Sequence, residues 1–162
     1  MELAQAQKTA DSAVERFRPS CTKIEVAGSV RRRRPFVNDI DIVLIPTDRY
    51  ALDRVLMEMA VEFTGSPKLK IAGPKIARVL YRGIYLDIYY ATAETFPTLL
   101  LIRTGSRRHN VSLAFRAKDK GWRLHASGDG LFDADDQRIA GDTEESIFET
   151  LGLPYKAPEK RE

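Results

Sequence analysis

The chain has 162 residues, of which 43% are hydrophobic and 30% charged, with a net charge of +3 and a single cysteine. These values are typical of a folded globular protein of one domain or two small ones, and they exclude a disordered chain or a disulfide-rich scaffold. The single cysteine favours an intracellular, reducing setting, cytoplasmic if the protein is prokaryotic or viral. Because no apolar run approaches the ~20 residues that span a bilayer, we expect no membrane partner.

The first half of the chain predicts two helices and two strands. Apolar residues at helical spacing predict a helix over residues 3–17, and a short apolar run predicts a strand over residues 24–27. A second strand is predicted over residues 39–45, and Thr47 or Asp48 caps the helix that follows it.

The second half begins with a hairpin, in which two apolar strands over residues 76–81 and 84–90 flank an Arg82-Gly83 turn. The rest predicts a helix over residues 94–103, a turn at 104–106, a helix ending near residue 120, a strand pair within 122–132 and a last helix. This order of helices and strands indicates an α+β fold.

Three aspartates lie on predicted apolar strands, where a charged side chain does not contribute to folding. Asp39 and Asp41 are two residues apart on a predicted strand, so their side chains leave the same face. Asp87 lies within an apolar hairpin strand. If the two strands are neighbours, the carboxylates converge, and their repulsion and lost hydration require positive charge nearby. Two Mg²⁺ ions ~3.5–4 Å apart, or Mn²⁺ in their place, would supply it; so would the arginines 31–34.

Groups that suit phosphate lie close to these acids in sequence. Gly28-Ser29 ends a strand, where a small residue lets backbone N–H groups approach an anion and the serine adds a hydroxyl. Four arginines follow at 31–34, and we expect one or two of them in the site and the others in solvent or on DNA. Together these residues are suited to a nucleoside triphosphate.

Charge is divided unevenly along the chain. Residues 1–128 carry 22 lysines and arginines against 13 aspartates and glutamates, whereas residues 129–162 carry 4 against 10. A basic body indicates a polyanionic partner, although a solvated charged surface has the same composition.

The pattern resembles the nucleotidyltransferase superfamily and, more narrowly, the family X DNA polymerases of the polymerase beta type. The motifs that carry the resemblance are Gly28-Ser29-Val30-Arg31-Arg32, Asp39-Ile40-Asp41, Asp87, Arg103-Thr104-Gly105-Ser106 and Asn110. The resemblance covers nearly the whole chain. It implies an α+β fold with a palm over residues 1–103, built on a mixed sheet with helices on one side, and a small α+β thumb over residues 104–162.

The resemblance also implies template-directed addition of deoxynucleotides to a DNA 3′-hydroxyl, with short-gap filling in repair as the setting. Asp39 and Asp41 would bind both metal ions and Asp87 the catalytic one. DNA, gapped or as primer and template, and deoxynucleoside triphosphates are the expected partners of a monomer. The nucleotide-binding candidates are Gly28, Ser29, Arg32, Asn38, Thr104, Gly105, Ser106, Arg107 and Asn110. The DNA-binding candidates are Arg108, His109 and Arg116.

The sequence also departs from the family pattern. Ile102-Arg103 replaces an aromatic pair, Tyr85 stands where a basic residue often precedes the third acid, and Ala114 replaces an arginine that the type member places against the template base. Two other functions are left open: a nucleotidyltransferase with the same palm that modifies RNA, protein or a small molecule, and a non-catalytic nucleic-acid-binding module.

Overall fold

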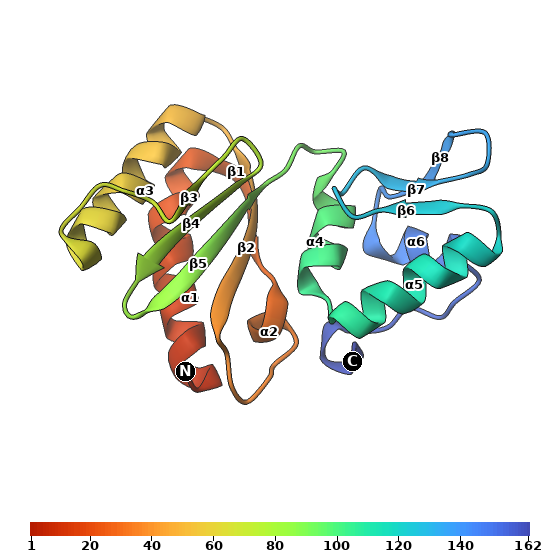
Figure 1. Ribbon diagram of the computed structural model, residues 1–162, viewed down its shortest axis with the longest axis horizontal. Coiled ribbons are helices and arrows are strands. Elements are labelled where there is room, and N and C mark those ends of the chain that lie inside the picture. The colour runs from red at the N-terminus through yellow and green to blue at the C-terminus, as the bar shows by residue number, and fades with distance from the viewer.

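The computed structural model describes residues 1–162 and has two α+β lobes (Figure 1). The N-terminal lobe is built on a five-stranded mixed sheet with the strand order β1-β2-β5-β4-β3. Only β2 and β5 run parallel to each other; the other neighbours are antiparallel. The strands are β1 Cys21–Val26, β2 Asp39–Pro46, β3 Ile71–Ala72, β4 Ile76–Tyr81 and β5 Ile84–Tyr90.

Two long helices, α1 Leu3–Phe17 and α3 Arg49–Thr64, cover one face of this sheet. The helices pack on this face because side chains alternate between the two faces along β2. Every second residue, at positions 40, 42 and 44, is apolar and buried in the core shared with these helices. Asp48 caps α3 by accepting a hydrogen bond from the Ala51 amide, as predicted. None of the helices has both the length and the apolar character needed to cross a membrane.

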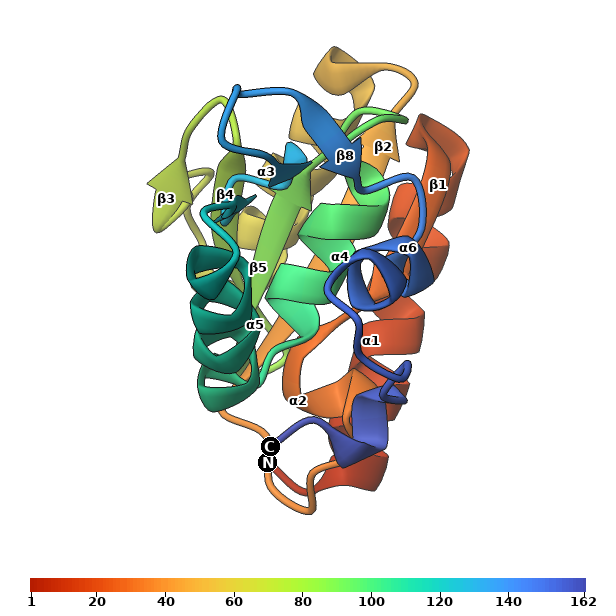
Figure 2. The same ribbon diagram turned by 90° about the vertical axis from the view of Figure 1, so that its right-hand side faces the viewer.

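The opposite face of the sheet is covered by α4 Phe96–Thr104, so the expectation of helices on one side only is wrong in this detail. Val43 and Tyr89 point to this face and pack with Leu99 and Leu100. The next residue of α4, Leu101, belongs instead to the core of the C-terminal lobe. Figure 2 shows α4 lying across β2 and β5, with α5 and α6 on either side of it.

The C-terminal lobe packs two helices against a three-stranded antiparallel sheet, around a core that includes Leu113, Leu131 and Phe148. Its elements are α5 Arg107–Asp119, β6 Arg123–His125, β7 Gly130–Phe132, β8 Arg138–Ala140 and α6 Glu144–Thr150. Three further short helices complete the chain, namely η1 Arg18–Ser20, α2 Gly28–Arg31 and η2 Pro158–Lys160.

Candidate active site

The parallel pairing of β2 with β5 brings the three aspartates together, as predicted. Asp41 lies opposite Asp87 in the register, and Asp39 lies opposite Tyr85. Because side chains two residues apart leave the same face of a strand, Asp39 and Asp41 share the face that α4 covers further along β2.

Arg78 on β4 supplies positive charge to two of the three carboxylates. Its Nε and one terminal nitrogen each donate a hydrogen bond of 2.5 Å to Asp87, and the same terminal nitrogen lies 3.6 Å from Asp39. These hydrogen bonds to Asp87 raise the pKa of the Arg78 guanidinium. The Asp87 side chain is only 5% exposed. Divalent ions are therefore not the only possible counter-charge, and the neutralising arginine is not one of the four at 31–34.

The register of the hairpin identifies this arginine. A two-residue turn at 82–83 pairs Tyr81 with Ile84, and counting outward along both strands pairs Arg78 with Asp87. Arg78 was not among the predicted site residues, although counting residues outward from the predicted Arg82-Gly83 turn would have paired it with Asp87.

Asp41 lacks such compensation. Burial, followed by repulsion from Asp39 and Asp87, raises the pKa of Asp41 to about 7, although the neighbouring Tyr89 hydroxyl and the charge of Arg103 act in the opposite direction. Its carboxylate lies where a Cβ at Gly28 would be, and Gly28 has a φ of 58°, so both the contact and the backbone favour glycine.

The donor chemistry of the aspartates fits a divalent cation, because Asp39 and Asp41 offer hard oxygen ligands and Asp41 is a half-buried carboxylate with no cationic hydrogen-bond partner. In this conformation, however, no three acidic, histidine or cysteine side chains are arranged to hold one ion, and Arg78 binds both oxygens of Asp87. Asp87 can act as a ligand only if Arg78 shares it or releases it.

Of the four consecutive arginines, Arg32 reaches the space beside the acids. Its guanidinium donates hydrogen bonds to the Thr104 carbonyl and, at 3.4 Å, to the Ser29 hydroxyl. Burial lowers the pKa of Arg32, and the neighbouring charge of Arg34 adds to the effect. Gly105 has no side chain to occupy the place of the guanidinium, which lies against it.

The other three arginines form ion pairs with acids of the C-terminal part of the chain; Arg33 is nevertheless 76% exposed, in line with the expected place in solvent, whereas Arg31 and Arg34 are mostly covered. Their ion pairs are Arg31–Glu144 at 2.7 Å, Arg33–Glu159 at 3.5 Å and Arg34–Glu162 at 2.5 Å. Glu144 also binds the fully buried Arg161 at 3.1 Å, and these two guanidinium groups hold its pKa below the usual range despite its burial. The uneven charge of the sequence therefore serves in part to attach the two lobes to each other.

A pocket of about 340 Å³ opens between the lobes beside Asp41. It is lined by Gly28, Ser29, Arg32, Asp41, Tyr89, Ile102, Arg103, Gly105, Arg107, Asn110 and Val111. Three buried polar atoms on this lining have no hydrogen-bond partner: Nε of Arg32, Nε of Arg103 and Oδ1 of Asn110. Unsatisfied buried groups of this kind are expected where a polar ligand binds.

The structure assembles most of the predicted nucleotide-binding residues around this pocket. Thr104 is buried, where its hydroxyl accepts a hydrogen bond from Arg31, and Ser106 caps α5; both hold the turn without lining the pocket. Asn38 is exposed ahead of β2 and also lies outside the pocket lining.

His109 does not lie on a surface that DNA could reach, which contradicts the prediction for this residue. It is 5% exposed and its ring lies 5.7 Å from that of Phe148. Burial lowers the pKa of His109 to about 4, so the imidazole is neutral. Arg108 and Arg116 do lie on the outer side of α5.

Four residues of the pocket lining were not predicted as ligand-binding, namely Tyr89, Ile102, Arg103 and Val111. Arg103, noted only as a departure from the family pattern, has its guanidinium carbon 4.2 Å from the centre of the Tyr89 ring, an arrangement that favours cation–π attraction. The sequence signal for Tyr89 was its place on the same face of β5 as Asp87, two residues away.

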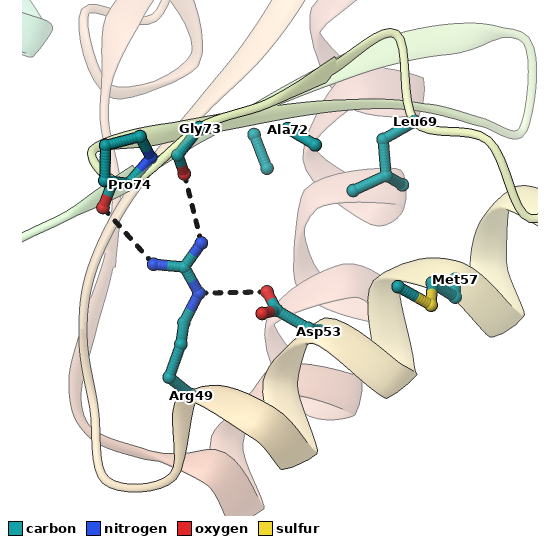
Figure 3. Close-up of a pocket in the computed structure, with 8 residues that line it drawn as sticks. Arg49, Asp53, Met57, Leu69, Ala72, Gly73 and Pro74 are labelled. Atoms are coloured by element: carbon teal, nitrogen blue, oxygen red, sulfur yellow. Dashed lines mark hydrogen bonds and ion pairs between the residues drawn. The ribbon is translucent and has the colours of Figure 1, made fainter.

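A second cavity, of about 280 Å³, lies between α3 and the loop that precedes β4 (Figure 3). Arg49 is the cationic side chain in it, and its guanidinium already donates to Asp53 and to the Gly73 and Pro74 carbonyls. The remaining lining is largely apolar, so this cavity has no free charged group with which to bind a polar ligand.

Comparison with known proteins agrees with this geometry. Residues 99–162 match the family model of the DNA polymerase beta thumb. The chain is 32% identical over 143 residues to DNA polymerase/3′-5′ exonuclease PolX of Bacillus subtilis, covering 86% of this chain and 24% of that protein. It is 29% identical over 147 residues to Repair DNA polymerase X of African swine fever virus, covering 85% of this chain and 80% of that protein.

The fold also matches a solved structure. Polymerase beta of Leishmania infantum, crystallised as a ternary primer–template complex, superposes with a TM-score of 0.82 at 21% identity, over 100% of this chain and 76% of that one. Among the sequence relatives, this chain spans about a quarter of the length of the Bacillus subtilis protein and four fifths of the length of the viral protein. By the aspartates, the glycine-serine turn, the thumb match and these relatives, the chain resembles the family X DNA polymerases, a group of nucleotidyltransferases, over most of its length.

Proposed function

We propose that this protein is a template-directed DNA polymerase that adds deoxynucleotides to a DNA 3′-hydroxyl and fills short gaps during repair. The observation that carries the proposal is the one pocket that a half-buried carboxylate, Asp41, lines together with Arg32 and Ser29 from the N-terminal lobe and Asn110 from the C-terminal lobe. A pocket shared between a carboxylate-bearing sheet and a second lobe suits a nucleoside triphosphate whose base must also meet a template.

The residues of the chain have distinct roles in this proposal. Arg32 and the Ser29 hydroxyl bind the outer phosphates, with charge-assisted hydrogen bonds from the guanidinium. Gly105 lines the pocket and lets the Arg32 guanidinium lie against it, and Asn110 offers its unpaired Oδ1 to the incoming nucleotide. The primer 3′-oxygen forms the new bond to the α-phosphorus as pyrophosphate leaves.

Asp39 and Asp41 would hold two Mg²⁺ or Mn²⁺ ions, and Asp87 would join them as a ligand of the ion nearest the primer once Arg78 shares its carboxylate. When bound, such ions lower the pKa of the primer hydroxyl and neutralise the departing pyrophosphate. The name Repair DNA polymerase X of the viral relative supports the repair setting. The excess of lysine and arginine over residues 1–128 supports DNA as the partner.

Primer extension tests the proposal on gapped, nicked and single-stranded DNA, with each deoxynucleotide and with and without Mg²⁺ or Mn²⁺. We expect metal-dependent addition of the nucleotide complementary to the template, fastest on gapped DNA. Addition without regard to template would instead favour another nucleotidyltransferase activity, and no addition to any substrate would favour a binding module. The Asp87→Asn variant should lose addition, whereas Glu58→Gln, an exposed carboxylate of α3, should retain it.

A further inference from the structure

The outer face of α5 presents apolar side chains that no other element covers. Phe115 is 61% exposed and Val111 44% exposed, and a spacing of four residues makes them neighbours on the helix surface. Single exposed apolar residues are common on proteins, but these two, with Leu153, line one open groove of about 570 Å³. The groove is therefore a continuous surface feature.

The charged residues of this groove favour an anionic occupant. Arg108 and Arg116 line it together with a single acid, Asp119. Arg116 donates its Nε to the Leu151 carbonyl at 3.3 Å, and neither arginine forms an ion pair. Because no acid pairs with them, these two guanidinium groups are free to meet phosphate.

The groove continues from the candidate active site. Val111 lines both the groove and the pocket between the lobes, while Asn110 beside it lies in the pocket alone. Phe115 follows one turn further along α5, which begins beside α4 and runs away from the N-terminal lobe (Figure 1). A strand whose base is read in the pocket would thus reach Phe115 within a few nucleotides.

We propose that this groove binds an unpaired template base adjacent to the nucleotide pocket, with Phe115 stacking on the base and Arg108 and Arg116 contacting the flanking phosphates. The proposal rests on the polymerase function proposed above. An exposed aromatic ring between two unpaired cations is the arrangement by which proteins bind single strands without reading their sequence, since every base has a face on which to stack.

The test measures the Kd of two fluorescently labelled primer–template DNAs. The single-stranded template extends about four nucleotides beyond the primer in the long overhang and about one in the short overhang. On the long overhang, Phe115→Ala should weaken binding about tenfold, and Phe115→Leu, which keeps apolar area but not the ring, should weaken it similarly. On the short overhang both variants should match the wild type. Tyr50→Ala, which removes an exposed ring from α3 in the other lobe, is the control and should change neither affinity.

Abasic DNA tests the same contact without altering the protein. Removing the stacked base from the long overhang should weaken wild-type binding about as much as Phe115→Ala does, and combining the two changes should add little. Equal affinity for intact and abasic overhangs at every single-stranded position overturns the proposal, as does a Phe115→Ala variant that binds both overhangs like the wild type.

Extension activity separates this proposal from the function on which it rests. A wild-type protein that extends primers but is indifferent to the overhang base refutes the groove proposal alone. A wild-type protein that adds no nucleotide to any substrate refutes the polymerase function, whatever the overhang measurements give.

Discussion

Replacing Asp41 with asparagine tests the electrostatics of the site in protein freed of divalent ions. Burial and the neighbouring carboxylates raise the pKa of Asp41 from 3.8 to about 7. Between these values the folded protein retains a proton on Asp41 that the unfolded chain has released, so the free energy of unfolding falls as the pH rises through this window. At about 1.36 kcal/mol per pKa unit, Asp41 costs the folded protein roughly 4 kcal/mol by about pH 8.

Asparagine has nearly the shape of a protonated aspartate and cannot ionise. The free energy of unfolding of Asp41→Asn should therefore match that of the wild type near pH 4 and exceed it by roughly 4 kcal/mol near pH 8. Urea unfolding in a chelator, followed by the fluorescence of Trp122, measures this difference across the pH range. Glu58→Gln controls for the loss of one negative charge, because Glu58 is exposed on α3.

Parallel pH profiles for the wild type and Asp41→Asn would refute the reasoning, since they would mean that Asp41 ionises as easily in the folded protein as in the unfolded chain. A second measurement sharpens the test. Mg²⁺ added near pH 8 should stabilise the wild type more than Asp41→Asn, because the variant has lost the carboxylate whose ionisation most needs a counter-charge.

Other variants test the remaining contacts. Arg32→Ala should raise the KM for nucleotide more than the Kd for DNA; the reverse would place its guanidinium on DNA. Glu144→Gln should lower the free energy of unfolding by about 3–5 kcal/mol, because two guanidinium groups lose their buried partner, and a loss below about 1 kcal/mol would contradict this. Arg78→Ala should tighten Mn²⁺ binding measured by calorimetry, since Arg78 and metal compete for Asp87; an unchanged affinity would argue against competition. The logarithm of DNA affinity should fall with the logarithm of salt by about 0.9 per phosphate contacted, and a flat response would contradict binding through arginines.

Much of the fold could be predicted because its main elements repeat a clear pattern. Strands β4 and β5 occupy the predicted residues 76–81 and 84–90, since β-branched and aromatic residues flank an unambiguous turn. Strands β3 and β8 were missed because two or three residues carry too little periodicity to be distinguished from a loop. The position of α4 on the second face of the sheet depends on tertiary packing that periodicity does not encode.

The candidate site was predictable where its parts are close in sequence or joined by strand pairing. The meeting of Asp41 with Asp87 followed from two neighbouring strands. The partners of Arg31 and Arg34 lie more than a hundred residues away, so no local pattern pointed to them. His109 illustrates the same limit: it follows two arginines in sequence, but the helix turns its ring inward against Phe148.

The division of α4 between two hydrophobic clusters bears on how the protein can be dissected. Leu99 and Leu100 complete one cluster and Leu101 the other, so a cut after residue 103 would remove Leu101 from the fragment that begins at residue 104. The matched thumb region, which starts at residue 99, retains it. A stable C-terminal fragment therefore needs the whole of α4 from Phe96, with polar substitutions at Leu99 and Leu100 to make the newly uncovered surface compatible with water.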